Sequence, residues 1–163
     1  MERRGEDGVE TKLRSLRQSL PDIEGKIGRD PNLSRLWRWV RTIYATHGIT
    51  LRGVAREVCL SPDHMNDLLK GACGLTLKQL LIRIRLLAAA DILAREPNTR
   101  IEEVGLRVGF GSVSAFERRC KDNLGVAPRV LKKLEKFPIS ADSPLPICAR
   151  LSRVENRKGR PGG

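Results

Sequence analysis

The side chains best suited to chemistry in this sequence follow a glycine-bounded turn, GFGS, at residues 109–112. Arg118 lies shortly after this turn, and an arginine can donate two parallel hydrogen bonds to the O6 and N7 atoms of guanine. Between the turn and residue 133, basic residues outnumber the acids Glu117 and Asp122. These basic residues are Arg118, Arg119, Lys121, Arg129, Lys132 and Lys133. Because phosphate neutralisation dominates nucleic-acid affinity, the pattern predicts noncovalent binding of a polyanion.

The composition of the whole chain also favours a nucleic-acid partner. The 163 residues carry a formal net charge of +12, and the pI is near 10.3. Such a balance favours an anionic partner; an anionic membrane surface and a merely solvated basic surface are the alternatives. Aromatic residues make up only 4% of the chain, which disfavours RNA because its bases are commonly stacked on aromatic side chains.

No enzyme, metal centre or cofactor is expected. The sequence shows no paired carboxylates, glycine-rich phosphate loop or catalytic triad pattern, so no residue is assigned a catalytic role. His47 and His64 have no zinc-ligand spacing to the cysteines, which we expect to be reduced thiols. The four cysteines are Cys59, Cys73, Cys120 and Cys148.

The location of the protein is expected to be cytoplasmic, in association with the nucleoid. No apolar run approaches the roughly 18 residues that span a bilayer. The first residues, MERRGEDGVE, lack the apolar segment of a signal peptide. We therefore expect no membrane partner.

The chain divides into three parts by composition. Residues 1–31 are polar and rich in glycine and charge, which predicts a flexible N-terminal segment with room for a short helical turn around residues 13–20. Residues 32–136 form the expected globular domain. Residues 137–163 contain Pro144, Pro146 and the ending NRKGRPGG, which predict a disordered basic tail.

The globular part is predicted to be all-α, with about seven helices, because apolar residues recur at helical spacing and no strand alternation is sustained. Ser61, Thr76 and Ser112 are expected N-caps, and Thr99 with Glu102 has the spacing of a capping box. The expected helices cover about 33–44, 51–58, 62–73, 77–96, 100–108, 113–124 and 128–136.

Two windows of the sequence repeat one another. Residues 54–75 and 104–126 each contain a short helix, a tight turn and a serine-capped second helix, with Ser61 matching Ser112. A small residue in each first helix, Ala55 or Gly105, allows the two helix axes to approach closely. Each window therefore predicts a helix-turn-helix unit, with a long helix joining the two. A plain seven-helix bundle that uses these turns only for packing is the alternative.

The chain resembles the DNA-binding domain of the AraC/XylS family of bacterial transcription regulators. The resemblance covers about residues 33–135 and is carried by VCLSPDHM at 58–65, RLLAAADIL at 85–93, and GFGSVSAF and GVAP at 109–116 and 125–128. The resemblance implies that two helix-turn-helix units bind adjacent major grooves and that the protein controls transcription, usually as an activator. Activation would require a contact with RNA polymerase, which is therefore a second expected partner. Too few residues precede the domain for a ligand-binding domain, so the chain looks like a short member that binds as a monomer, or a truncated one. Departures from the family pattern at Leu69, Gly105, Ala115 and Cys120 are expected to preserve the fold with looser packing.

Positions on the two second helices give the expected DNA contacts. Arg118 is suited to guanine, Asn66 to adenine and Val113 to a thymine methyl group, whereas Asp63 and Asp67 are either acceptors for cytosine N4 or simple helix N-terminal acids. The candidate base contacts are Asp63, Asn66, Asp67, Val113, Ser114, Glu117 and Arg118. The candidate phosphate contacts are Arg52, Lys70, Arg100, Arg119 and Lys121. The alternative function is a non-specific nucleic-acid-binding or protein-interaction bundle.

Overall fold

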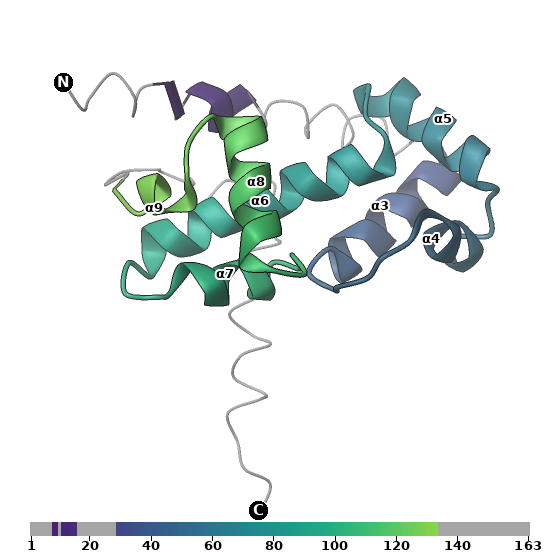
Figure 1. Ribbon diagram of the computed structural model, residues 1–163. Coiled ribbons are helices and arrows are strands. Elements are labelled where there is room, and N and C mark those ends of the chain that lie inside the picture. Colours follow the sequence, from purple (N-terminus) through teal and green to yellow (C-terminus); the bar gives the residue numbers. More distant parts are fainter. Residues whose placement is uncertain (1–7, 10, 16–28, 134–163) are drawn as a thin grey trace, which may run out of the picture.

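The computed structural model describes residues 8–9, 11–15 and 29–133, and these residues contain helices but no strand. In chain order the helices of the continuous part are α3 (Pro31–Ile43), α4 (Leu51–Glu57), α5 (Pro62–Cys73), α6 (Leu77–Arg95), α7 (Ile101–Arg107), α8 (Val113–Leu124) and α9 (Pro128–Leu131). Figure 1 shows their arrangement. The prediction of an all-α fold is confirmed.

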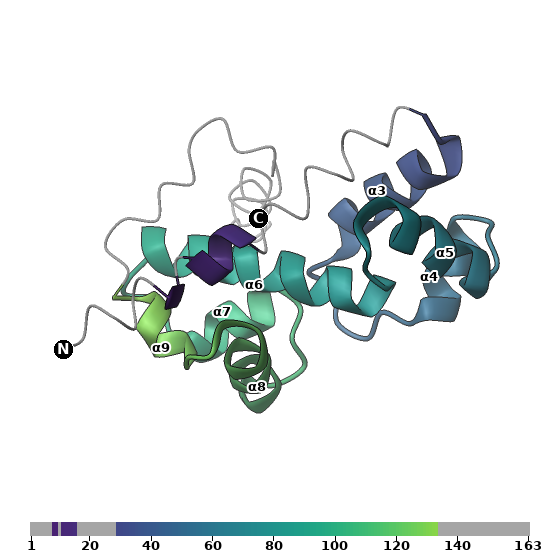
Figure 2. The same ribbon diagram turned by 90° about the horizontal axis from the view of Figure 1, so that it is seen from above.

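The long helix α6 is the centre of the molecule. Figures 1 and 2 show α3–α5 grouped at one end of α6 and α7–α9 at the other. Apolar side chains are buried around the whole circumference of α6, from Leu80 and Ile84 to Leu93, because neighbours cover it on more than one side. We call α4 with α5 the first unit and α7 with α8 the second unit; α6 joins them, as predicted.

Three of the predicted helix caps are confirmed. The hydroxyl oxygens of Ser61 and Ser112 accept hydrogen bonds from the His64 and Ala115 amides, at 3.2 and 3.1 Å. Thr76 forms a complete capping box with Gln79. An additional cap was missed: the Asp30 carboxylate accepts from the Asn32 amide at 2.8 Å, so α3 begins at Pro31, inside the predicted flexible segment.

The predicted capping box at Thr99 is wrong. Helix α7 begins at Ile101 with Arg100 as its N-cap, and no side chain caps it. The Thr99 hydroxyl instead donates to the Glu96 carboxylate at 3.0 Å, and Arg107 binds the same carboxylate at 2.9 Å. The Thr99 hydroxyl therefore binds Glu96 at the end of α6 and does not cap α7. The hydrogen bond from Arg107 to the Glu96 carboxylate lowers the pKa of Glu96.

Residues 8–9 and 11–15 of the N-terminal segment are helical. Val9 and Leu13 lie one helical turn apart and are 1% and 0% exposed, so they belong to the core. A Cβ atom placed on Gly125, at the end of α8, would lie 2.8 Å from the Lys12 Nζ, which places this stretch beside the second unit. The rest of residues 1–28 and the predicted tail, 137–163, lie outside the described residues.

The described cysteines differ sharply in their environment. Cys59 is exposed, whereas Cys120 is fully buried, and burial together with nearby Glu117 raises the pKa of the Cys120 thiol to about 12. Because the thiolate is the reactive form, we expect an alkylating reagent at pH 8 to modify Cys59 in the folded protein and to modify Cys120 only after unfolding. Peptide mass spectrometry over a time course measures this, and equal labelling rates for the two thiols would contradict the packing of α8.

Candidate nucleic-acid interface

The two units share one turn geometry. In each unit, one backbone hydrogen bond closes the turn. The Leu60 amide donates to the Ala55 carbonyl, and the Phe110 amide donates to the Gly105 carbonyl, both at 2.9 Å. In both turns one residue adopts a positive φ, +57° at Cys59 and +99° at Gly109. The backbone therefore repeats the helix-turn-helix that the sequence repeat predicts.

At Gly105, the second unit packs more closely than its departure from the family pattern predicted. A Cβ atom at Gly105 would lie 2.8 Å from Cδ1 of Phe116, a fully buried side chain whose ring stacks on Phe110 with centroids 5.1 Å apart. Ala55 occupies the equivalent position in the first unit, where buried Met65 replaces Phe116. Gly105 thus makes room for a rigid ring, and the expectation of looser packing at this position is wrong.

Adding a methyl group at this contact tests it. We expect Gly105→Ala to lower the free energy of unfolding by about 1–3 kcal/mol, because the Phe116 ring must shift within a filled core. Gly71→Ala is the matched control, since a Cβ atom at Gly71 meets nothing within 4 Å, and we expect it to stabilise α5 by about 0.5–1 kcal/mol. Urea denaturation of both variants gives the comparison; a Gly105→Ala protein at least as stable as the wild type would contradict the close approach.

The outward faces of α5 and α8 carry equivalent exposed positions. Asp63, Asp67 and Lys70 on α5 match Ser114, Arg118 and Lys121 on α8 when the serine caps are aligned, and all six side chains are exposed. The face of α5 is acidic at its start, whereas the face of α8 is basic. The two units therefore present the same geometry with different chemistry.

The remaining base-contact candidates are less accessible. Val113, Asn66 and Glu117 are only partly exposed. The Asn66 side-chain oxygen accepts from the Leu77 amide at the start of α6, at 3.3 Å, so a bidentate contact with adenine would require this bond to break. In the second unit, Pro128 occupies the position equivalent to Leu77, and proline has no amide hydrogen to donate.

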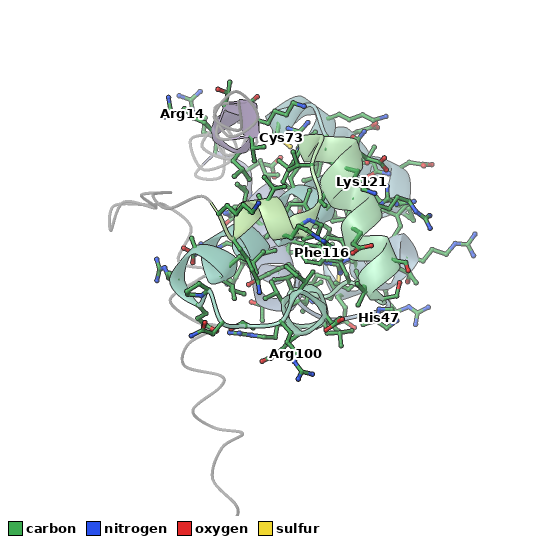
Figure 3. All side chains as sticks on the ribbon, turned by 60° about the vertical axis from the view of Figure 1, so that its left-hand side comes forward. Arg14, His47, Cys73, Arg100, Phe116 and Lys121 are labelled. Carbon is green, nitrogen blue, oxygen red and sulfur yellow. The ribbon has the colours of Figure 1, made fainter. Side chains whose placement is uncertain are left out.

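The phosphate-contact candidates are spread over several elements. Lys70 and Lys121 are exposed near the ends of α5 and α8, Arg52 is exposed on α4, and Arg119 is partly exposed on α8. Figure 3 shows Lys121 on the outer side of α8 and Phe116 directed into the core. Arg100 is exposed at the start of α7, well away from Lys121 in the same view. The structure thus places Lys121 and Arg119 on the same helix, but on different sides of it, and Arg100 on another element.

Arg85 joins the loop after α3 to the turn of the second unit, a role that sequence reasoning missed. From α6 its Nε donates to the Tyr44 carbonyl at 2.7 Å and one terminal nitrogen donates to the Thr46 carbonyl at 3.0 Å. Its guanidinium also lies 5.8 Å from the centroid of the Phe110 ring in the second turn. Burial lowers the pKa of Arg85, yet arginine remains charged at neutral pH.

The backbone of the second turn also touches the end of α3. A Cβ atom at Gly109 would lie 2.8 Å from the Tyr44 carbonyl oxygen and 2.9 Å from the Ala45 carbonyl carbon. Together with Arg85, this contact fixes how the second unit is oriented relative to the segment that leads into the first. The signal in the sequence was the arginine of RLLAAADIL, whose partners are distant backbone atoms.

The described part of the chain contains neither a candidate metal site nor a candidate membrane-spanning helix. No group of three or more His, Cys, Asp or Glu side chains among these residues is placed to hold a metal ion. None of the helices described here combines the length and apolar character needed to cross a bilayer.

Comparison with known proteins identifies the kind of domain. A family of helix-turn-helix domains matches residues 54–133. The C-terminal domain of AraT, a response regulator from Geobacillus stearothermophilus, superposes with a TM-score of 0.62 at 25% identity and covers 69% of this chain and 93% of its own. The C-terminal domain of the two-component response regulator yesN from Fusobacterium nucleatum gives a TM-score of 0.59 at 18% identity, covering 63% and 99%. No curated protein matches the sequence.

Proposed function

We propose that this protein, whose residues 54–133 form a helix-turn-helix DNA-binding domain of the AraC type, is a transcription regulator that recognises a specific double-stranded DNA sequence. In this proposal α5 and α8 are the recognition helices and enter successive major grooves on one face of the duplex. Their binding sites would then lie about one helical turn, roughly 34 Å, apart. The domain match points to a regulator without enzymatic activity.

The observation that carries the proposal is the matched pair of exposed helix faces. Two helices with the same cap, the same turn and the same exposed positions both pack on α6. Arg85 of α6 also binds the loop after α3 and lies beside the Phe110 ring in the turn before α8. A rigid pair suits DNA because the spacing of grooves on a duplex is fixed. A bundle that used its turns only for packing would not need Ser114, Arg118 and Lys121 on an exposed face.

The second unit is proposed to anchor the complex. On α8, Arg118 and Lys121 are exposed and Arg119 is partly exposed, whereas the exposed start of α5 carries Asp63 and Asp67. Because phosphate neutralisation supplies much of the binding free energy, α8 should contribute more affinity than α5. The acids of α5 would instead contribute sequence selectivity, by accepting hydrogen bonds from cytosine N4.

The other features of the proposal come from the family resemblance. They are binding as a monomer, activation through a contact with RNA polymerase, and a cytoplasmic location in association with the nucleoid. None of them is needed for the DNA-binding test.

Fluorescence anisotropy tests the proposed partner directly. The full chain is titrated into labelled duplex DNA at several salt concentrations, with unlabelled single-stranded RNA of the same sequence as competitor. We expect duplex binding that weakens steeply as salt rises and that RNA displaces poorly. Equal competition by RNA, or no binding at low salt, would favour the alternative of a non-specific or protein-interaction bundle.

A further inference from the structure

A concave surface lies between the two units. It encloses about 570 Å³ and is lined by the loop after α3, the first half of α6 and the start of α8. Leu81, Ile82 and Phe110 contribute to its apolar floor. We call this surface the inter-unit cleft; Asn66 of α5 borders it from the first unit and Arg119 of α8 from the second.

The inter-unit cleft is cationic. Lys78, Arg85 and Arg119 line it beside the His47 imidazole, and no aspartate or glutamate is among the described residues that do so. Arg85 is held by backbone carbonyls rather than by an acid. Within the described residues, Lys78 and Arg119 form no ion pair with a carboxylate. Clustered cations that are left unneutralised favour an anionic occupant.

His47 ties this cleft to the start of the second recognition helix. A Cβ atom at Gly111 would collide with the His47 imidazole, so the ring from the first half of the molecule packs on the residue before the Ser112 cap. Figure 3 shows His47 close to this end of α8. The glycine leaves space for the ring, and the ring remains exposed to solvent.

We propose that the inter-unit cleft holds the sugar–phosphate backbone of the DNA segment between the two bound major grooves, with His47, Lys78 and Arg119 contacting its phosphates. This inference rests on the proposed function. A duplex that touches the exposed faces of both α5 and α8 must pass over the surface between them, and its backbone brings the negative charge that the cleft lacks. The apolar floor suits the deoxyribose, whose surface is largely apolar.

Removing the cations one at a time tests the proposal. Lys78→Gln and Arg119→Gln, and the double variant, are compared with Arg14→Gln. This control removes the same charge from an exposed position that lies well away from His47 in Figure 3. The measurement is the slope of log K against log salt for a fixed duplex. We expect Lys78→Gln and Arg119→Gln each to reduce the slope by about 0.9, and the double variant to reduce it by about 1.8, because each phosphate contact releases counterions. Binding should weaken equally on all sequences.

The outcomes separate this inference from the proposed function. Slopes of the two cleft variants that equal the slope of Arg14→Gln would overturn the backbone assignment, even when the wild type binds its own site. A wild type that shows no sequence preference would contradict the proposed function, while the slopes on any duplex would still report on the cleft. A third outcome is that decanoate shifts the tryptophan fluorescence of the wild type but not of the double variant, while the salt slopes of the cleft variants equal that of the wild type. The cleft would then bind amphipathic carboxylates instead of DNA.

The contact of His47 with Gly111 gives a second, independent test. We expect His47→Ala and Gly111→Ala to weaken DNA binding by similar factors, and the double variant to be no weaker than either, because the added methyl group displaces the same imidazole. Effects that multiply in the double variant would show that the ring does not act from this position. Circular dichroism melting of each variant confirms that the fold is retained.

Discussion

A protein carrying Gly109→Ala is expected to lose about 2–5 kcal/mol of unfolding free energy, the largest stability effect that we predict for a single methyl group. The φ angle of +99° at this position is one that side chains rarely adopt. The added Cβ would also lie 2.8 and 2.9 Å from backbone atoms of Tyr44 and Ala45, which cannot rotate away. Strain in the turn and displacement of the end of α3 therefore add together.

The first unit supplies the control for this prediction. Cys59 occupies the equivalent turn position with a φ of +57° and an exposed side chain. Cys59→Gly should relieve the left-handed strain and change stability only slightly, between no effect and a gain of about 1 kcal/mol. Urea denaturation of both variants gives the test, and a Gly109→Ala protein as stable as the wild type would show that the second turn is not pressed against α3.

Arg118→Ala is expected to weaken binding to the preferred DNA site by about 1–3 kcal/mol, or roughly 5- to 150-fold, and to relax the preference at one base pair. Arg118 is exposed on the outer face of α8, at the position that matches Asp67 of α5. A loss confined to sites with guanine at that position would identify a base contact, since guanine presents both acceptors in the major groove.

Arg118→Lys distinguishes a base contact from a phosphate contact. Lysine keeps the charge but lacks the planar pair of donors, so it should retain phosphate binding and lose most of the bidentate guanine contact. Binding constants are measured on the preferred duplex and on its single-base variants. If Arg118→Ala weakens all duplexes by one factor and Arg118→Lys restores them all, Arg118 contacts phosphate and does not read a base.

Local sequence determined what could be predicted of this fold. The caps at Ser61 and Ser112 depend on residues within one helical turn, so their spacing in the sequence was sufficient. Thr99 had the same local pattern, but Glu96 from the preceding helix bound its hydroxyl. A side chain from outside the motif decided the outcome there.

The arrangement of the two units was beyond local reasoning. Arg85 binds carbonyls 41 and 39 positions earlier in the chain, and neither its partners nor the contact of Gly109 with Ala45 follows from periodicity. The buried N-terminal residues Val9 and Leu13 were missed because the surrounding composition is polar. For the interface, the sequence predicted which helix faces would be exposed, while the DNA contacts of each residue stay predictions until binding is measured.

Selection of binding sites from random duplex DNA, read by sequencing, tests most directly whether two units read adjacent grooves. We expect an asymmetric two-part motif with centres about 10 base pairs apart, in which the half bound by α8 is the more strongly selected. A single short motif would mean that α5 positions the protein without reading bases. No enrichment, with binding that simply weakens as salt rises, would contradict sequence-specific recognition and leave a non-specific basic bundle.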